Sequence, residues 1–171
     1  AALLMAVAPI DKKWGVKRVI VSTYQAVSGA GDKAIADLAS QTQEYLKTGF
    51  VKDSGVFPYP IAFNVLAHNW KIEKNGYSNE ENKIMTETHK IMGNPSIQVI
   101  ATTVRVPVFN AHSESIYIET KKPVTVAAVR AALAKFPGVR IVDEKSPLGK
   151  SICPMPQNAS GRDEILIGRI R

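Results

Sequence analysis

The stretch Thr103-Val-Arg-Val-Pro-Val-Phe-Asn-Ala-His-Ser-Glu-Ser115 decides the interpretation of the whole chain. Every second residue near its start is a valine: Val104, Val106 and Val108. This alternation is typical of a strand with one buried face, and it predicts that Arg105 lies on the face opposite the valines. Proline has no N–H to donate to a neighbouring strand. The strand is therefore expected to end near Pro107 or to lie at the edge of a sheet.

Two residues of this stretch could act on a substrate. Asn110 and Ala111 predict a turn, His112 follows it, and a second strand is expected over residues 115–120. The guanidinium of Arg105 can bind a carboxylate through two hydrogen bonds, and the imidazole of His112 can move a proton near neutral pH. Together they predict a site for an anionic substrate. The alternative is that both are ordinary polar surface residues.

Composition and charge exclude several classes of protein. The 171 residues are 45% hydrophobic and 22% charged, which suits one domain with its own core. No apolar run approaches 18 residues, so no membrane span is expected. The net charge of +7 is scattered rather than clustered with aromatic residues, so nucleic-acid binding is not expected. The three histidines are dispersed, and no metal site is expected.

The chain contains one cysteine, Cys153. An internal disulfide is therefore excluded, and a reducing compartment is favoured. Prolines flank Cys153, and no helix begins after it to stabilise a thiolate, so a packing role is the preferred interpretation.

The first half of the chain has a strand–loop–helix pattern. A helix is expected over residues 1–13, bent or ended by Pro9, followed by a strand over 16–24 and a helix over 32–46 with Asp32 as its N-cap. The loop between strand and helix contains Ser28-Gly-Ala-Gly31. Such a loop can cradle a phosphate or lie against a flat cofactor ring, although it lacks the full dinucleotide fingerprint and a plain turn is the alternative.

The second half predicts a mixture of further helices and strands. An extended apolar segment is expected over 59–66, a helix over 80–92 capped by Ser78 or Asn79, and a helix over 124–136 that starts near Thr125. Strands are expected over 99–108, 115–120, 139–142 and 163–170, with a loop over 147–156. Glu80, Lys83 and Glu87 are spaced to share one helix face. The order predicts an α+β fold.

Several longer motifs resemble the aspartate-semialdehyde dehydrogenase family. They cover essentially the whole chain: Val21-Ser-Thr-Tyr-Gln-Ala-Val-Ser-Gly-Ala-Gly31, Tyr59-Pro-Ile-Ala-Phe-Asn64, Glu80-Glu-Asn-Lys83, Arg105-Val-Pro-Val, His112-Ser-Glu, and Gly161-Arg-Asp-Glu to Gly168-Arg-Ile-Arg171. The resemblance implies a mixed, mostly antiparallel sheet with helices on one face, similar to the C-terminal domain of glyceraldehyde-3-phosphate dehydrogenase. It also implies that the other face of the sheet pairs with a second subunit.

The activity that the resemblance implies is the NADP-dependent reductive dephosphorylation of β-aspartyl phosphate to aspartate semialdehyde, which belongs to lysine, threonine and methionine biosynthesis. A cysteine thiolate attacks the carbonyl group, and phosphate resolves the thioester. The roles implied for this chain cover proton transfer, substrate binding and cofactor contact. Gln25 orients the intermediate, and His112 is the acid/base. Arg105 binds the α-carboxylate, Glu80 binds the amino group and Lys83 binds the phosphate. Ser28, Gly29 and Gly31 lie by the nicotinamide.

The resemblance also implies that parts of the enzyme lie outside these residues. The nucleophile of the family would precede residue 1, Cys153 is not in its place, and the cofactor domain lies upstream. Residues 1–171 are therefore expected to form a substrate-binding, catalytic and dimerisation domain truncated at both ends, which binds NADP mainly through the missing domain. A homodimer or tetramer is expected, in the cytoplasm or in a plant plastid. Two alternatives are an N-acetyl-glutamyl-phosphate reductase and a non-catalytic dimerisation module.

Overall fold

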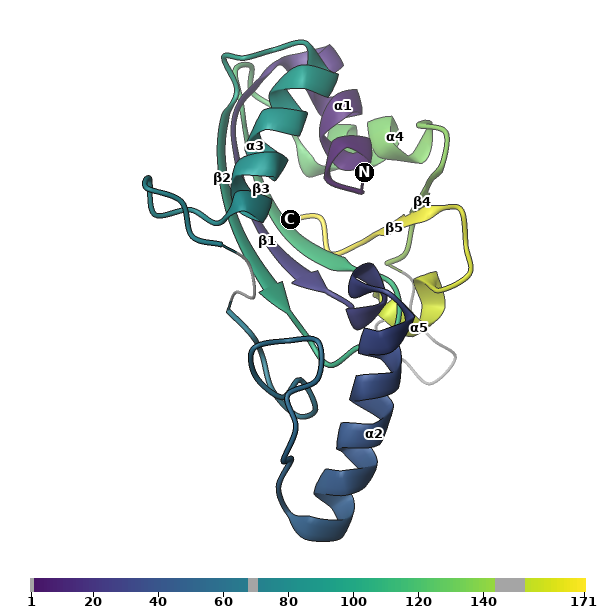
Figure 1. Cartoon of the computed structure of the whole chain (residues 1–171). Helices are drawn as coiled ribbons and strands as arrows, with labels where there is room; N and C mark the ends of the chain where they lie inside the picture. The colour runs from purple at the N-terminus through teal and green to yellow at the C-terminus, as the bar shows by residue number, and fades with distance from the viewer. Residues whose placement is uncertain (1, 68–70, 144–152) are drawn as a thin grey trace. The chain divides into compact units, whose positions relative to one another are not determined.

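A computed structural model of the chain describes residues 2–67, 71–143 and 153–171. Helices and strands are mixed along the chain, as Figure 1 shows. In order, the elements are α1 (Ala2–Trp14), β1 (Val16–Gln25), the 3₁₀ turn η1 (Val27–Ala30), α2 (Asp32–Thr48), α3 (Asn79–Met92), β2 (Gln98–Arg105), β3 (Ser113–Thr120), α4 (Val126–Ala134), β4 (Val139–Ile141), α5 (Pro156–Ala159) and β5 (Ile165–Ile167). The predicted α+β class and mixed sheet are confirmed.

The strands β2, β1 and β3 pair in that order, so β2 is an edge strand of this sheet. The arrows of β1 and β2 point the same way in Figure 1, and β4 pairs with β5 in parallel. The expectation that the strand stops near Pro107 is confirmed, because β2 ends at Arg105. Its predicted faces are wrong: Arg105 lies on the buried face and is 4% exposed, while Val104 is only half-buried.

The chain divides into two compact units. Their bounds are Ala1–Val21, Met85–Ile100 and Glu114–Arg171 for the first unit, and Ser22–Ile84 and Ala101–Ser113 for the second. In the first unit, α1 packs on α4 and contacts β5. Pro9 was predicted to bend or end the first helix. It does not end the helix, because α1 continues through Pro9 to Trp14.

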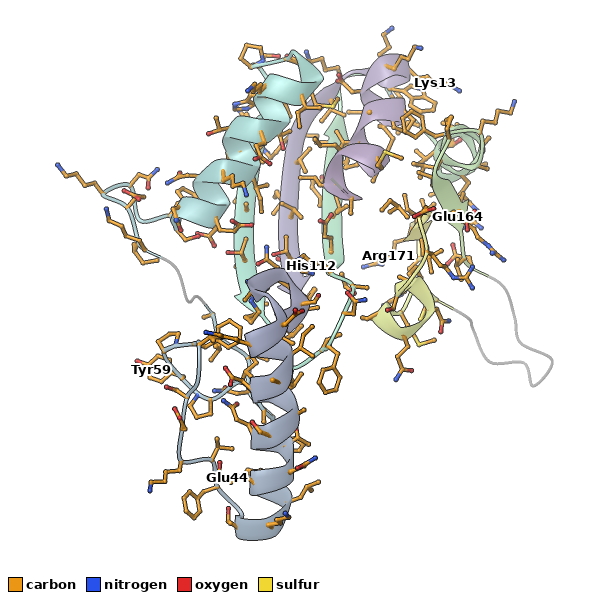
Figure 2. The ribbon with its side chains drawn as sticks, turned by 45° about the vertical axis from the view of Figure 1, so that its right-hand side comes forward. Lys13, Glu44, Tyr59, His112, Glu164 and Arg171 are labelled. Carbon is orange, nitrogen blue, oxygen red and sulfur yellow. The ribbon has the colours of Figure 1, made fainter. Side chains whose placement is uncertain are left out.

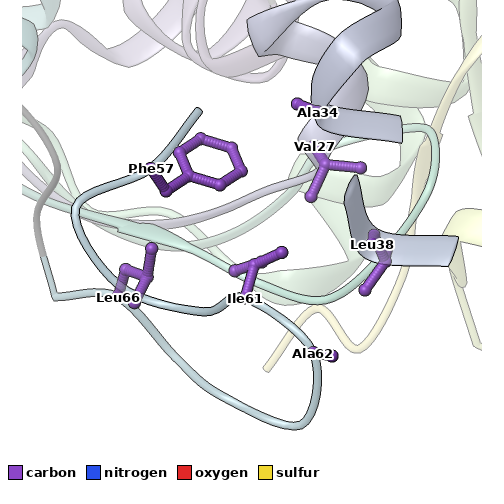
Figure 3. Packing of buried hydrophobic residues seen from close by; sticks show 7 residues of the cluster. All are labelled: Val27, Ala34, Leu38, Phe57, Ile61, Ala62 and Leu66. Carbon is purple, nitrogen blue, oxygen red and sulfur yellow. The ribbon is translucent and has the colours of Figure 1, made fainter. Parts of the chain in front are cut away.

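In the second unit a cluster of apolar side chains holds α2 against the loop that follows it, as Figure 3 shows. Its members are Val27, Ala34, Leu38, Phe57, Ile61, Ala62 and Leu66. The N-cap of α2 is Gly31, so the expectation that Asp32 caps this helix is wrong; Asp32 instead places a carboxylate in the first turn. Gly49 ends α2 in the left-handed conformation, with φ 78°.

The remaining elements follow the predicted pattern with some differences. Ser78 caps α3 and Thr125 caps α4 through their side-chain oxygens, as expected. Residues 59–66 form no regular strand; Leu66 alone bridges Arg105 at the edge of β2. The short helix α5 was not predicted, and most of the loop expected over 147–156 lies outside the described residues. None of the helices in the described ranges is long and apolar enough to cross a membrane.

Candidate active site

The backbone of Ala26, the residue directly after β1, holds two functional side chains. Its carbonyl oxygen accepts a hydrogen bond from Nη1 of Arg105 (2.7 Å), and its N–H donates to Nδ1 of His112 (3.1 Å). Arg105 reaches Ala26 from the end of β2, and His112 reaches it from the segment just before β3. The structure therefore brings together the two residues that the sequence singled out.

The turn η1 lies against this pair and is fastened to the segment that carries His112. The N–H groups of Val27 and Ser28 donate to the carbonyl oxygens of Val108 (2.9 Å) and Phe109 (3.1 Å). A β-carbon added at Gly29 would lie 3.1 Å from both Arg105 Nη1 and His112 Nε2. A residue with a side chain would crowd both groups, so glycine leaves room here for the positions that the two side chains occupy. Figure 2 shows His112 beside the start of α2.

The guanidinium of Arg105 also packs against an aromatic ring. The Phe57 ring, 3% exposed, has its centroid 5.7 Å from Arg105 Cζ, within the range of a cation–π contact. The buried amide of Gln41 fixes the loop that carries Phe57: Oε1 accepts from the N–H of Ile61 (2.8 Å), and Nε2 donates to the carbonyl of Asp53 (3.1 Å). These contacts explain why an arginine can occupy a buried strand position.

Glu80 joins the site from the first turn of α3. The side-chain amide of Gln25, the last residue of β1, donates to Glu80 Oε1 at 3.3 Å. Gln25 is buried and Glu80 is half-buried. Lys83 lies three residues further along α3 and is exposed. The site thus combines one buried cation, one carboxylate, one amide and one imidazole.

Burial and neighbouring charges set the protonation of these groups. Burial lowers the pKa of Arg105, and the carboxylate of Glu80 opposes that change. His112 is exposed, but burial of the side of its ring that packs on the protein lowers its pKa, Arg105 lowers it further, and Glu80 opposes both. The N–H of Ala26 needs a lone pair on Nδ1, so the neutral ring carries its proton on Nε2.

The predicted site residues are all in the second unit, and the structure links most of them. Gln25, Glu80, Arg105, His112 and Gly29 are connected by the contacts above. Ser28 donates through Oγ to Oδ1 of Asn110 (3.1 Å) at the margin of the site. Gly31, with φ 92°, and Lys83 are exposed and take part in none of these side-chain contacts.

Sequence reasoning missed three groups that build the site: Ala26, Phe57 and Gln41. Ala26 acts through its backbone alone, which leaves no signal in the side-chain pattern. An aromatic residue within the polar, turn-rich segment 47–60 was a visible signal for Phe57. Among the described residues, no group of three or more His, Cys, Asp or Glu side chains could hold a metal ion.

Curated relatives match almost the whole chain. The aspartate-semialdehyde dehydrogenase of Aquifex aeolicus is 47% identical over 169 residues, which are 99% of this chain and 49% of that protein. The enzyme of the same name from Synechocystis sp. is 42% identical over 171 residues and is covered to the same extent. The chain therefore spans about half the length of the curated relatives it matches.

Solved structures share the fold. The crystal structure of aspartate semialdehyde dehydrogenase II complexed with ASA from Vibrio cholerae matches with a TM-score of 0.92 and 37% identity, covering 99% of this chain and 49% of that one. The structure of the Candida albicans enzyme with NADP matches with a TM-score of 0.67 at 20% identity, covering 99% of this chain and 46% of that one, which shows a shared fold.

The family model described as "Semialdehyde dehydrogenase, dimerisation domain" matches residues 7–171. This match covers nearly all of the chain, including every residue of the site described above. The chain therefore belongs to the semialdehyde dehydrogenase family, as its dimerisation domain.

Proposed function

We propose that this chain supplies the substrate-binding and proton-transfer half of an NADP-dependent aspartate-semialdehyde dehydrogenase. The reaction converts β-aspartyl phosphate to aspartate semialdehyde and phosphate, or runs in reverse. The names of the curated relatives and of the Vibrio cholerae structure support this substrate. The observation that carries the proposal is the pairing of Arg105 and His112 on the backbone of Ala26, with Gly29 leaving room beside both.

In this proposal Arg105 and Glu80 bind the two charged groups of the amino-acid end of the substrate. The planar guanidinium of Arg105 can form two parallel hydrogen bonds to the α-carboxylate. Glu80, whose charge opposes the effect of burial on the pKa of Arg105, can accept from the α-ammonium group. A cation and an anion at the same site would select a substrate that carries both charges on one carbon.

His112 is proposed to transfer the proton at the reacting oxygen. Its Nδ1 is occupied by the N–H of Ala26, so Nε2–H is the group available to the substrate. A neutral Nε2–H can donate a hydrogen bond to a carbonyl oxygen and protonate it as negative charge develops. The side-chain amide of Gln25, which contacts Glu80, would orient the bound intermediate from the end of β1.

The cofactor proposed for this site is NADP, which supplies or accepts the hydride when bound. Ser28, Gly29 and Gly31 fit a flat ring because the turn is exposed from Gly29 to Gly31 and carries no side chain larger than a methyl group there. Gly29 adjoins His112 Nε2, so a ring on this turn would lie near the proposed proton donor. Most of the cofactor would be bound by the half of the relatives that this chain does not span, which would also supply the nucleophilic cysteine.

The proposal also includes a role for Lys83 and an assembly of several subunits. Lys83, exposed one turn after Glu80 on α3, is proposed to bind the substrate phosphate. Within the first unit, the neighbouring strands β1, β2 and β3 expose apolar side chains at Ile20, Ile100 and Tyr117. We propose that this face pairs with a second copy in a homodimer, with a tetramer as a larger assembly. We also propose that the enzyme is cytoplasmic, because the low cysteine content of this chain suits a reducing compartment.

The proposal is tested with the full-length protein that contains this chain. Purified protein is incubated with aspartate semialdehyde, phosphate and NADP, and NADPH formation is followed by absorbance. Dependence on both phosphate and NADP is the expected result, with little activity when N-acetyl-glutamate semialdehyde replaces the substrate. Activity with the N-acetylated substrate alone would support the related reductase instead, and inactivity with both would support a non-catalytic dimerisation module.

A further inference from the structure

Glu81 follows Glu80 in the first turn of α3, but its carboxylate faces the protein backbone. Oε2 accepts the N–H of Ser78 (2.8 Å), and the Oγ of Ser78 accepts the N–H of Glu81 (3.1 Å), so the two residues form a reciprocal capping box. Oε1 accepts the N–H of Thr103 (2.9 Å) near the end of β2. One carboxylate therefore joins the start of a helix to a strand.

This second bond occupies the open edge of the sheet. On the edge strand β2, the N–H groups of Thr103 and Arg105 point the same way, because they are two residues apart. The N–H of Arg105 donates to the carbonyl of Leu66 (2.9 Å), whereas that of Thr103 donates to Glu81. Glu81 thus fills the place of a missing neighbouring strand, two residues before Arg105.

We propose that Glu81 is a positioning residue that fixes the spacing between Arg105 and Glu80. This inference rests on the proposed function, in which Arg105 binds the carboxylate of the substrate and Glu80 binds its amino group. Arg105 belongs to β2 and Glu80 to α3, and Glu81 links these two elements directly. Binding sites of this kind depend on supporting residues that hold the contacting groups to within about 0.5 Å.

The proposal predicts a specific effect on substrate choice. Aspartate semialdehyde needs Arg105 and Glu80 at one fixed separation, because its two charged groups share a carbon. Succinic semialdehyde has the same chain and carboxylate but no amino group, so it needs Arg105 alone. Loss of the Glu81 link should therefore reduce kcat/KM for aspartate semialdehyde more than for succinic semialdehyde.

The experiment compares Glu81→Gln and Ser78→Ala in the full-length protein. Glutamine is neutral and carries an NH₂ group in place of one carboxylate oxygen, so it can keep only one of the two bonds, and that bond without the assistance of a charge. Ser78→Ala removes the capping hydroxyl but leaves the bond from Glu81 to Thr103, so it is the matched control for a role in capping alone. For each protein, kcat/KM is measured for both aldehydes with NADP and phosphate, and the melting temperature is recorded.

We expect Glu81→Gln to lower the ratio of kcat/KM for aspartate semialdehyde to kcat/KM for succinic semialdehyde by about tenfold. The loss of one charge-assisted hydrogen bond would have an effect of this size. Ser78→Ala should lower the melting temperature and leave the ratio unchanged. An unchanged ratio in Glu81→Gln, or an equal change in Ser78→Ala, would overturn the positioning role while leaving the proposed function intact. If the wild-type protein showed no activity towards aspartate semialdehyde, the proposed function would be overturned, and this inference with it.

Discussion

The guanidinium of Arg105 and the ring of His112 are hydrogen-bonded to the two backbone groups of one residue, Ala26. The carbonyl oxygen holds the cation and the N–H holds the imidazole, so the two side chains cannot shift independently of the end of β1. Because these contacts involve backbone groups, neither of them depends on the side chain at position 26.

Gly29→Ala should damage the site without unfolding the protein. The added β-carbon would lie 3.1 Å from Arg105 Nη1 and His112 Nε2, closer than most real contacts, and would push both groups away. The backbone at Gly29 needs no positive φ, so the fold should tolerate alanine. We expect kcat/KM for aspartate semialdehyde to fall about tenfold. Ala36→Ser, on the exposed side of α2, is the control; equal kinetics in both variants would contradict the close approach.

The ionisation of His112 should depend on Glu80. Burial and Arg105 lower the pKa of His112, and the Glu80 carboxylate raises it, so Glu80→Gln should lower the pKa further. NMR titration of the ring measures this directly. A rise in the pKa of His112 in Glu80→Gln would show that the carboxylate does not face the ring.

The lowered pKa of His112 also makes the stability of the protein depend on pH. The pKa of His112 is lower in the folded protein than its ordinary value of 6.5, so the unfolded chain binds a proton first as the pH falls. His112 therefore costs no stability above pH 6.5 and lowers stability as the pH falls below that value. His112→Gln should reduce this loss, which urea denaturation at pH 7 and pH 5 would detect. A pH dependence identical to that of the wild type would contradict the prediction.

Phe57 should affect substrate binding through its contact with Arg105. Phe57→Leu keeps an apolar side chain in the core but removes the ring 5.7 Å from the guanidinium. A cation–π contact of about 0.5–1 kcal/mol corresponds to a rise of about two- to fivefold in KM for aspartate semialdehyde. Tyr59→Leu, at an exposed aromatic residue in the same loop, is the control. A KM that responds equally to both variants would indicate a general effect of the loop.

Two glutamates lie on β3, and removal of the charge of each should shift the Tm in opposite directions. Burial raises the pKa of Glu114, and its Oε2 finds no hydrogen-bond partner within the described part of the chain. The unfolded chain therefore loses its proton first as the pH rises, and stability falls above about pH 4.5. We expect Glu114→Gln to raise the Tm at pH 7 by about 3 °C, with the gain fading near pH 4.

Glu119 is the matched comparison. Its hydrogen bond and ion pair with Lys17 at 2.7 Å lower its pKa, with a further contribution from Arg18. Its charge therefore contributes stability at pH 7 that is lost in acid. Glu119→Gln should lower the Tm slightly at pH 7 and have no effect near pH 3. If both substitutions shifted the Tm in the same direction at pH 7, the opposite environments of the two carboxylates would be contradicted.

The periodicity of the sequence predicted most elements but not which face of β2 is buried. Three valines usually mark the core side of a strand, yet the core side here carries Arg105. The arginine is tolerated there because the Ala26 carbonyl and the Phe57 ring accompany it, and both come from segments far away in the sequence. Long-range contacts of this kind leave no trace in local periodicity.

The candidate site could be predicted only in part for the same reason. Arg105 and His112 were recognisable by side-chain chemistry and by family resemblance, whereas Gln25 and Glu80 were recognisable by family resemblance alone. The capping box formed by Ser78 and Glu81 has a local signature, although its bond to Thr103 does not. Pro9 shows the opposite limit: a residue that usually ends a helix lies inside α1, where the surrounding apolar residues pack into a core.

The most direct test of the central claim is the discrimination between aspartate semialdehyde and 3-aminopropanal, which lacks the α-carboxylate. The ratio of kcat/KM for the two aldehydes is measured for the full-length wild-type protein and for Arg105→Met. If Arg105 binds the carboxylate beside His112, the wild type should prefer aspartate semialdehyde by about a hundredfold or more, and Arg105→Met should lose most of that preference. A preference that survives unchanged in Arg105→Met would show that the carboxylate is bound elsewhere and would contradict the account.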